Sequence, residues 1–99
     1  MYLLLLAYDG KDPGALDRRM AARPAHLECI KAFIDAGTLK YGGALLNDEG
    51  KAIGSMLVFD YPSEEALRAE FLSVEPFVLE GVWESIEIRI FRPSDLFNK

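Results

Sequence analysis

The sequence is poor in the residues that build disulfides and metal sites. Its 99 residues include one cysteine, Cys29, and one histidine, His26. A single cysteine excludes an internal disulfide and a cysteine-rich zinc site. One histidine among scattered carboxylates has no metal-ligand spacing either. We therefore predict no metal and no cofactor, and the lone thiol favours a reducing cytoplasm over a secreted setting.

Positive charge is also scarce. Lys and Arg together number 11 against 16 Asp and Glu, for a formal net charge of −5. No basic stripe is present that could bind a phosphate backbone, so we expect no nucleic-acid partner. The apolar run at residues 2–8 has no basic leading segment and is far too short to cross a bilayer, which predicts no membrane partner.

Apolar residues, by contrast, are plentiful enough for one core. They make up 51% of the chain, and a chain of 99 residues is long enough for one domain but not for two. We therefore predict a single domain over residues 1–99, in which 93–99 form a C-terminal tail.

The pattern of apolar residues and turn signals predicts four strands and two main helices. Pro24 is expected at the first position of the main helix, which places His26 in its first turn, and Gly37 is the expected C-terminal cap. The expected strands cover 2–8, 39–46, 53–61 and 85–90; the expected helices cover 24–36 and 64–72, with a helical turn at 14–22 and irregular chain at 73–77.

This order, βαββαβ, is that of the α+β ferredoxin-like sandwich, or split βαβ fold. In that topology the first and third strands are central, and both helices cover one face of the sheet. The first strand is apolar throughout, so its second side would stay wet unless another surface covered it. We therefore predict a homodimer in which two sheets pack face to face.

His26 has two interpretations. It lies at helical spacing from Ile30 and Phe33, where a lone histidine is more often structural than catalytic. An imidazole is also the side chain best suited to proton transfer near neutral pH. Arg19 and Arg23 would share its helix face if the helix were continuous; they are either solvated arginines or a grip for a carboxylate or phenolate.

The candidate partner of His26 is Glu75, in the segment SVEPF. It is either a surface acid or the acceptor that fixes the imidazole tautomer. Cys29 lies three residues after His26, and we favour a small apolar role over a nucleophilic one. Aromatic side chains that could line a pocket, or simply fill a small core, are Tyr41, Phe77 and Trp83.

The sequence resembles the YciI-like (YCII-related) proteins over nearly its whole length. The matching segments are LDRRMAARPAHL, AGTLKYGGAL, the Gly54 and Ser55 pair, and EPFVLEGVWESIEIRIF. The resemblance implies ferredoxin-like subunits that assemble into a dimeric α+β barrel.

The resemblance also implies a pocket with a catalytic histidine and aspartate. His26 matches the histidine, and Arg19 and Arg23 match the arginines that commonly precede it. Ser55 falls in the family's Gly-Ser segment. The family's aspartate, usually followed by Pro and an aromatic residue, is Glu75 here, which is longer by one methylene.

A second departure is Ala44, which stands where the family usually has proline. Most members have no assigned reaction, and one branch resembles a dehydrochlorinase that acts on a hydroxylated chloroaromatic. The sequence therefore predicts a cofactor-independent lyase or isomerase with His26 and Glu75 as catalytic residues, and Arg19, Arg23 and Ser55 as ligands of a small polar or aromatic substrate. Two alternatives are a pocket that binds a small anion without turnover and a dimeric interaction module.

Overall fold

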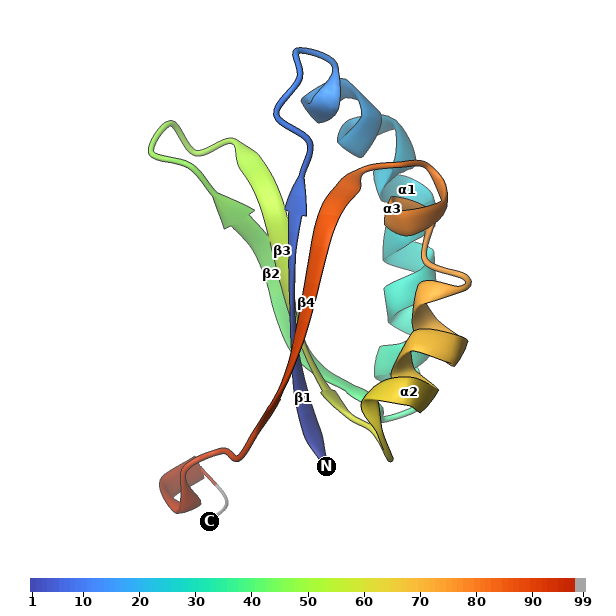
Figure 1. Cartoon of the computed structure of the whole chain (residues 1–99), viewed down its shortest axis with the longest axis vertical. Helices are drawn as coiled ribbons and strands as arrows, with labels where there is room; N and C mark the ends of the chain where they lie inside the picture. The colour runs from blue at the N-terminus through green and yellow to red at the C-terminus, as the bar shows by residue number, and fades with distance from the viewer. Residues whose placement is uncertain (98–99) are drawn as a thin grey trace.

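The computed structural model describes residues 1–97 and contains one four-stranded sheet with helices on one of its faces (Figure 1). The strands are β1 (Tyr2–Asp9), β2 (Leu39–Leu46), β3 (Ala52–Asp60) and β4 (Trp83–Phe91). The helices are α1 (Ala15–Asp35), α2 (Glu64–Leu67), which continues as the π-helical turn η1 (Arg68–Leu72), α3 (Pro76–Leu79) and the 3-10 turn η2 (Asp95–Phe97).

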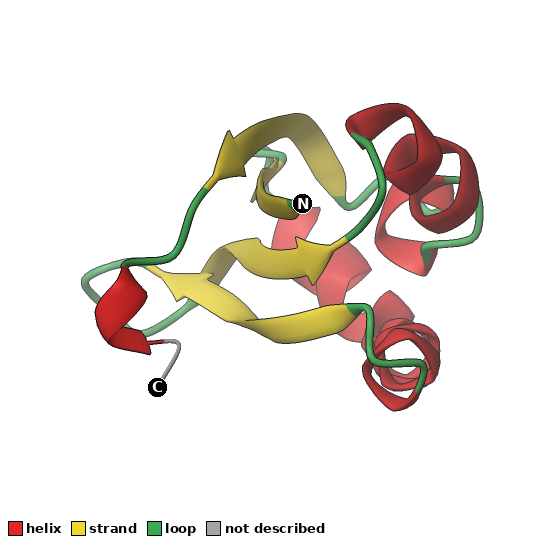
Figure 2. Cartoon of the chain, turned by 90° about the horizontal axis from the view of Figure 1, so that it is seen from below, coloured by secondary structure: helices red, strands yellow, loops and turns green. Residues whose placement is uncertain are grey.

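The sheet has the order β2-β3-β1-β4, and every neighbouring pair is antiparallel. The first and third strands are thus central, as predicted, and the ferredoxin-like α+β fold is confirmed. Figure 2 shows the helices between β1 and β4 together on one side of the strands, and the short turn η2 near the C-terminus on the other side. The expected 64–72 helix matches α2 and η1, and the Ser63 side chain caps it by accepting from the Ala66 N–H at 3.0 Å.

The core lies between the sheet and the helices. From β1 it takes Leu3, Leu5 and Ala7, which are fully buried, while the alternate residues point to the opposite face. None of α1, α2, η1 and α3 covers that opposite face, and its apolar side chains Leu4 and Leu6 are only partly buried. Further core side chains come from β3 and from the segment after it: Leu57, Phe59, Phe71 and Phe77.

The main helix differs from the sequence prediction. It begins at Ala15 rather than Pro24 and runs without interruption to Asp35, so Pro24 is internal and His26 lies in the middle of the helix. Proline removes one main-chain hydrogen bond here. Buried side chains on either side of it, Ala22 and His26, pack against the rest of the protein and hold the helix together. The C-terminal end agrees with prediction, since Gly37 has a φ of 81° and its N–H donates to the Ile34 carbonyl.

The segment 73–77, predicted to be irregular, contains the start of the short helix α3. Pro76 occupies its first turn, where a missing N–H is harmless, and Glu75 is its N-cap. An acid directly before proline is a signal for a helix start, but a helix of a single turn is too short to show helical periodicity in the sequence. Beyond β4, residues 93–97 extend from the sheet on the side opposite the helices (Figure 1). The remainder of the expected tail, 98–99, lies outside the described residues.

Candidate active site

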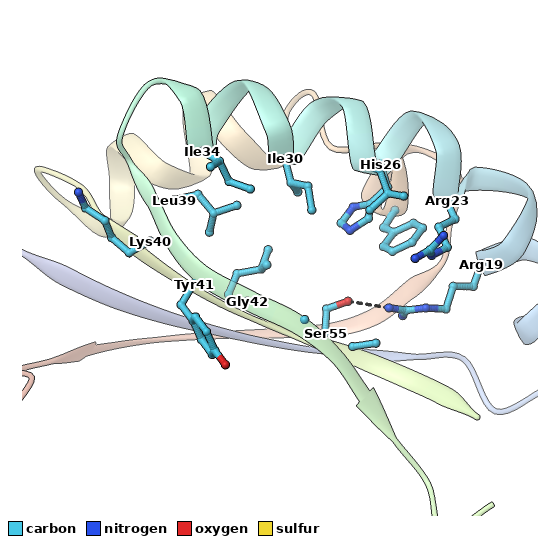
Figure 3. Close-up of a pocket in the computed structure, with 15 residues that line it drawn as sticks. Arg19, Arg23, His26, Ile30, Ile34, Leu39, Lys40, Tyr41, Gly42 and Ser55 are labelled. Carbon is cyan, nitrogen blue, oxygen red and sulfur yellow. Dashed lines mark hydrogen bonds between the residues drawn. The ribbon is translucent and has the colours of Figure 1, made fainter. Parts of the chain in front are cut away.

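The helix α1 presents one stripe of side chains to a space above β2 and β3. Because α1 is continuous, residues three or four positions apart fall on the same face. Figure 3 shows the stripe pointing toward the strands, with charged residues at one end and isoleucines at the other. Its members are Arg19, Arg23, His26, Ile30 and Ile34.

This space is a cavity of about 280 Å³. Its floor is formed by β2, where Gly42 and Gly43 add no side chain, and by Ser55 and Leu57 of β3. The full lining is Arg19, Arg23, His26, Leu27, Ile30, Ile34, Leu39, Lys40, Tyr41, Gly42, Gly43, Ala44, Ser55, Leu57 and Phe77. Four of the five residues predicted for the site therefore line one cavity, and Glu75 lies behind its wall.

Glu75 contacts His26 directly. Its Oε1 lies 2.5 Å from the imidazole Nδ1 and also accepts from the Phe77 N–H at 2.9 Å. The carboxylate is fully buried, and within residues 1–97 its Oε2 has no hydrogen-bond partner. The contact spans 49 positions of sequence. The N-cap geometry of α3 thus aims the Glu75 carboxylate at the imidazole.

This contact links the Glu75 carboxyl to one ring nitrogen of His26, and the donor and acceptor roles of the ring nitrogens depend on the tautomer. When the carboxyl oxygen is the acceptor, a neutral imidazole has its proton on Nδ1. The Nε2 lone pair is then left for a group in the cavity. His26 is 6% exposed, which limits the access of bulk water to that lone pair.

The Phe77 ring stacks on one face of the His26 imidazole. The two rings are parallel within 10°, with centroids 3.8 Å apart. Trp83 adds an edge contact, with its centroid 6.1 Å from that of His26. The imidazole is therefore fixed by a carboxylate at Nδ1 and by aromatic rings on its face and edge.

Arg19 belongs to a buried polar network. One guanidinium nitrogen donates to both Asp9 oxygens, at 2.9 and 3.1 Å, and another donates to the Ser55 hydroxyl at 3.0 Å. The Trp83 indole N–H donates to the same hydroxyl oxygen at 3.2 Å. Asp9 was missed by the sequence reasoning. Its signal is a carboxylate that ends an apolar strand, a position where a buried acid needs a cationic partner.

Arg23 has a different environment. It is exposed at the edge of the cavity, and the part of the chain that the structure describes gives it neither a hydrogen bond nor an ion pair. The sequence analysis assigned the same role, binding of a substrate anion, to both arginines. Arg19 is buried and balanced by Asp9, whereas the charge of Arg23 is available to a ligand.

Cys29 is on α1, one turn after His26, is partly buried, and does not line the cavity. Burial, with the Glu75 carboxylate nearby, raises the pKa of its thiol to about 11. A thiol with a raised pKa is a poor nucleophile near neutral pH. This supports the predicted apolar role.

Two further observations concern residues 1–97. No three His, Cys, Asp or Glu side chains in this range gather closely enough to hold a metal ion. None of the helices in this range has the length and apolar character needed to cross a membrane.

Comparison with known proteins decides the family. The model of the YCII-related domain matches residues 1–92. The chain belongs to the YCII-related family. Protein YciI of Escherichia coli strain CFT073 is 32% identical over 98 residues, which are 93% of this chain and 97% of that protein. A second relative, derivative of benzaldehyde biosynthesis cluster protein C of Emericella nidulans, is 38% identical over 73 residues, which cover 67% of this chain and 74% of that protein.

Solved structures of similar fold include the 5-chloro-2-hydroxyhydroquinone dehydrochlorinase TftG of Burkholderia phenoliruptrix AC1100, in complex with 2,5-dihydroxybenzoquinone. It superposes with a TM-score of 0.81, covers 97% of this chain and 98% of its own, and is 22% identical. A NIPSNAP family protein of Agrobacterium tumefaciens is more distant, with a TM-score of 0.55, 18% identity and coverage of 95% and 93%. Both likenesses concern the fold.

Proposed function

We propose that this YCII-related protein is a cofactor-independent enzyme in which His26 is the general base and Glu75 holds it in place. The observation that carries the proposal is the contact between His26 Nδ1 and the buried Glu75 carboxylate beside a cavity. An imidazole held at Nδ1, with Nε2 directed to the cavity, supports a role in proton transfer. When Nε2 takes a proton, the Glu75 carboxylate balances the new charge, as an acid partner does in hydrolytic triads.

Ser55 supplies a hydrogen-bond donor to the substrate. A hydroxyl has one donor and two acceptor positions. Both acceptor positions of Ser55 are used, by Arg19 and by Trp83, so its proton is free to point into the cavity. A donor fixed in this way stabilises negative charge that develops on a substrate oxygen.

Arg23 supplies the charge that attracts an acidic substrate. Its guanidinium stands at the cavity edge and has no carboxylate partner within residues 1–97, and its planar fork matches a carboxylate or a pair of phenolic oxygens. Arg19 serves mainly to position Ser55, because Asp9 balances its own charge.

The reaction class that fits best is a lyase, with isomerisation as the related possibility. TftG, which shares the fold, is a dehydrochlorinase of a chlorinated hydroxyhydroquinone. In such an elimination one hydroxyl proton of the substrate moves to the chlorine-bearing ring carbon, which gives a keto tautomer. His26 Nε2 then takes the proton of a second hydroxyl, the electron pair moves through the ring to form a new double bond at that carbon, and chloride leaves. One proton and one chloride are lost, and no oxidant or reductant is needed.

The test is turnover of 5-chloro-2-hydroxyhydroquinone and related hydroxylated chloroaromatics, followed by chloride release. We expect His26→Ala to lower kcat by at least about 100-fold, with an unchanged circular dichroism spectrum. Glu75→Gln should lower kcat by about tenfold or more because the carboxylate no longer balances the imidazolium. Full turnover in folded His26→Ala would overturn the proposal.

A second candidate function is binding of a small anion without turnover, and the free charge of Arg23 favours it. In that case a ligand such as 2,5-dihydroxybenzoquinone raises the melting temperature, is recovered unchanged, and still stabilises Glu75→Gln but not Arg23→Gln. If Glu75→Gln loses both turnover and the rise in melting temperature that the ligand causes, the result supports the enzyme instead.

The proposed working unit is a cytoplasmic homodimer. The open face of the sheet has partly buried apolar side chains on both central strands, including Leu4, Leu6 and Val58. Leu96 and Phe97 are exposed on the segment that extends on the same side as this face. A second copy packed there would cover both. The single cysteine fits a reducing compartment.

A further inference from the structure

We infer that the cavity binds an amphipathic anion, whose acidic head lies beside His26 and Arg23 and whose apolar extension runs along Ile30 and Ile34. The inference rests on the proposed function for the choice of the reacting end. A single-ring ligand without an apolar substituent would leave the part of the cavity beside Ile30 and Ile34 unfilled.

The lining of the cavity changes in character along α1. At the His26 end it is polar, with Arg23 at the edge and the Ser55 hydroxyl on the floor. One and two helical turns further on, the helix contributes Ile30 and Ile34 (Figure 3). The facing strands contribute Leu39 and Leu57 at that end. A ligand that matches the Ser55 and Arg23 end has its acidic group there, and its apolar group lies along Ile30 and Ile34.

The volume of the cavity exceeds that of a single ring. A closed apolar cavity of about 150 Å³ is enough to hold benzene. The cavity beside His26 measures about 280 Å³, nearly twice as much. A ring next to His26 therefore leaves space for an alkyl or second aromatic group.

The apolar end of the cavity reaches the surface. Ile34 lines the cavity and is 52% exposed, so a ligand that covers it removes apolar surface from water. Lys40 at the same end is exposed, so its ammonium can stay in water while the extension lies beside its stem (Figure 3). The extension can therefore continue past Ile34 without an end wall to limit its length.

The experiment measures the affinity of the full-length protein for benzoate, 4-butylbenzoate and 4-hexylbenzoate by calorimetry. Full burial of a methylene improves affinity by roughly fourfold. We expect about two- to fourfold per methylene because one end is open. Arg23→Gln should weaken all three ligands by a similar factor, since the head is common to them.

Ile34→Ala tests the position of the extension, with Met20→Ala as the matched control. Both residues are on α1 and exposed to similar extents, 52% and 56%, but Met20 does not line the cavity. Ile34→Ala should reduce the gain from the alkyl chain by about threefold or more, because the chain then buries less apolar surface against the helix, and leave benzoate binding nearly unchanged. Met20→Ala should alter neither.

Three results would overturn the inference: no binding by any of the three ligands, equal affinity for all of them, or equal effects of Ile34→Ala and Met20→Ala. The measurement is independent of turnover, and it is repeated in His26→Ala. A chain-length dependence in a protein that turns nothing over would support the inference and leave only the enzyme proposal without support. Turnover of a hydroxylated chloroaromatic by a protein with no chain-length dependence would do the reverse.

Discussion

At the scale of single residues, Phe77 fixes the candidate base in two ways. Its ring stacks on the imidazole of His26, and its main-chain N–H donates to the carboxylate oxygen of Glu75 that also contacts His26. One residue therefore orients both members of the proposed pair. The order of Glu75, Pro76 and Phe77 explains this, because Pro76 starts a helical turn that brings the next N–H back to the acid.

The residue types of the site were predictable, and their contacts were not. Helix periodicity places His26, Arg19 and Arg23 on one face only if the helix is continuous; the sequence prediction began it at Pro24, and the structure shows that it is continuous. The contact of His26 with Glu75 joins segments 49 positions apart, and only the tertiary fold determines it. The ion pair of Arg19 with Asp9 was likewise not predictable, because nothing in the local sequence tells a buried arginine from an exposed one.

Ser55→Ala should lower the free energy of unfolding by about 2 kcal/mol, because two buried donors, of Arg19 and Trp83, lose their shared acceptor. Urea denaturation measures the change, with the exposed Ser85→Ala on β4 as the control. Stability within about 0.5 kcal/mol of the wild type would show that the network does not depend on this hydroxyl.

Cys29 should react slowly with iodoacetamide in the folded protein. Its raised pKa, about 11, means that the neutral thiol persists as the pH rises and that the reactive thiolate forms only in strong base. We expect alkylation at pH 8 to be about tenfold or more slower than in urea, and the rate to keep rising with pH beyond 9. A rate that levels off near pH 8.5 would contradict the raised pKa.

At the scale of elements, α1 is where sequence and structure differ most. Proline usually predicts a helix start or a break, and the sequence reasoning placed a new helix there. In the structure the side chains packed before and after Pro24 keep one helix of 21 residues. Strands were easier to predict, since β2 has the expected bounds and the others differ by one or two residues. The alternation of apolar and polar residues was clearest in the edge strand β4, where Ile86, Ile88 and Ile90 alternate with Ser85, Glu87 and Arg89.

Pro24→Ala should stabilise the protein. It restores the hydrogen bond to the carbonyl of residue 20 and removes the clash of the ring, and the loss of proline's effect on the unfolded chain offsets part of this gain. We expect the free energy of unfolding to rise by about 2 kcal/mol in urea denaturation. A fall in stability would indicate that the helix is broken at this position in solution.

At the scale of the whole molecule, the sheet has two unequal faces. Helices cover one of them, and the cavity lies between that face and α1, near the edge strand β2. The opposite face has apolar side chains on both central strands and no covering element within residues 1–97. The sequence predicted this imbalance from the uninterrupted apolar run of β1, and the predicted cover is the sheet of a second copy.

The proposed homodimer can be tested by light scattering. The wild-type protein should have about twice the mass of one chain at micromolar concentration, and Leu4→Glu, on the open face, should have the mass of one chain because it puts a charge in an apolar interface. Met20→Glu, on the exposed side of α1, should remain a dimer. A wild-type monomer would rule the assembly out.

The central claim is that Glu75 holds His26 with Nδ1 protonated and Nε2 free to accept a proton from the cavity. Since His26 is the only histidine of the chain, the long-range proton–nitrogen NMR spectrum of its imidazole is free of overlap. At a pH where the ring is neutral, we predict a protonated Nδ1 and an unprotonated Nε2 in the wild type, and the loss of this preference in Glu75→Ala. A neutral ring with its proton on Nε2 in the wild-type protein would contradict the account.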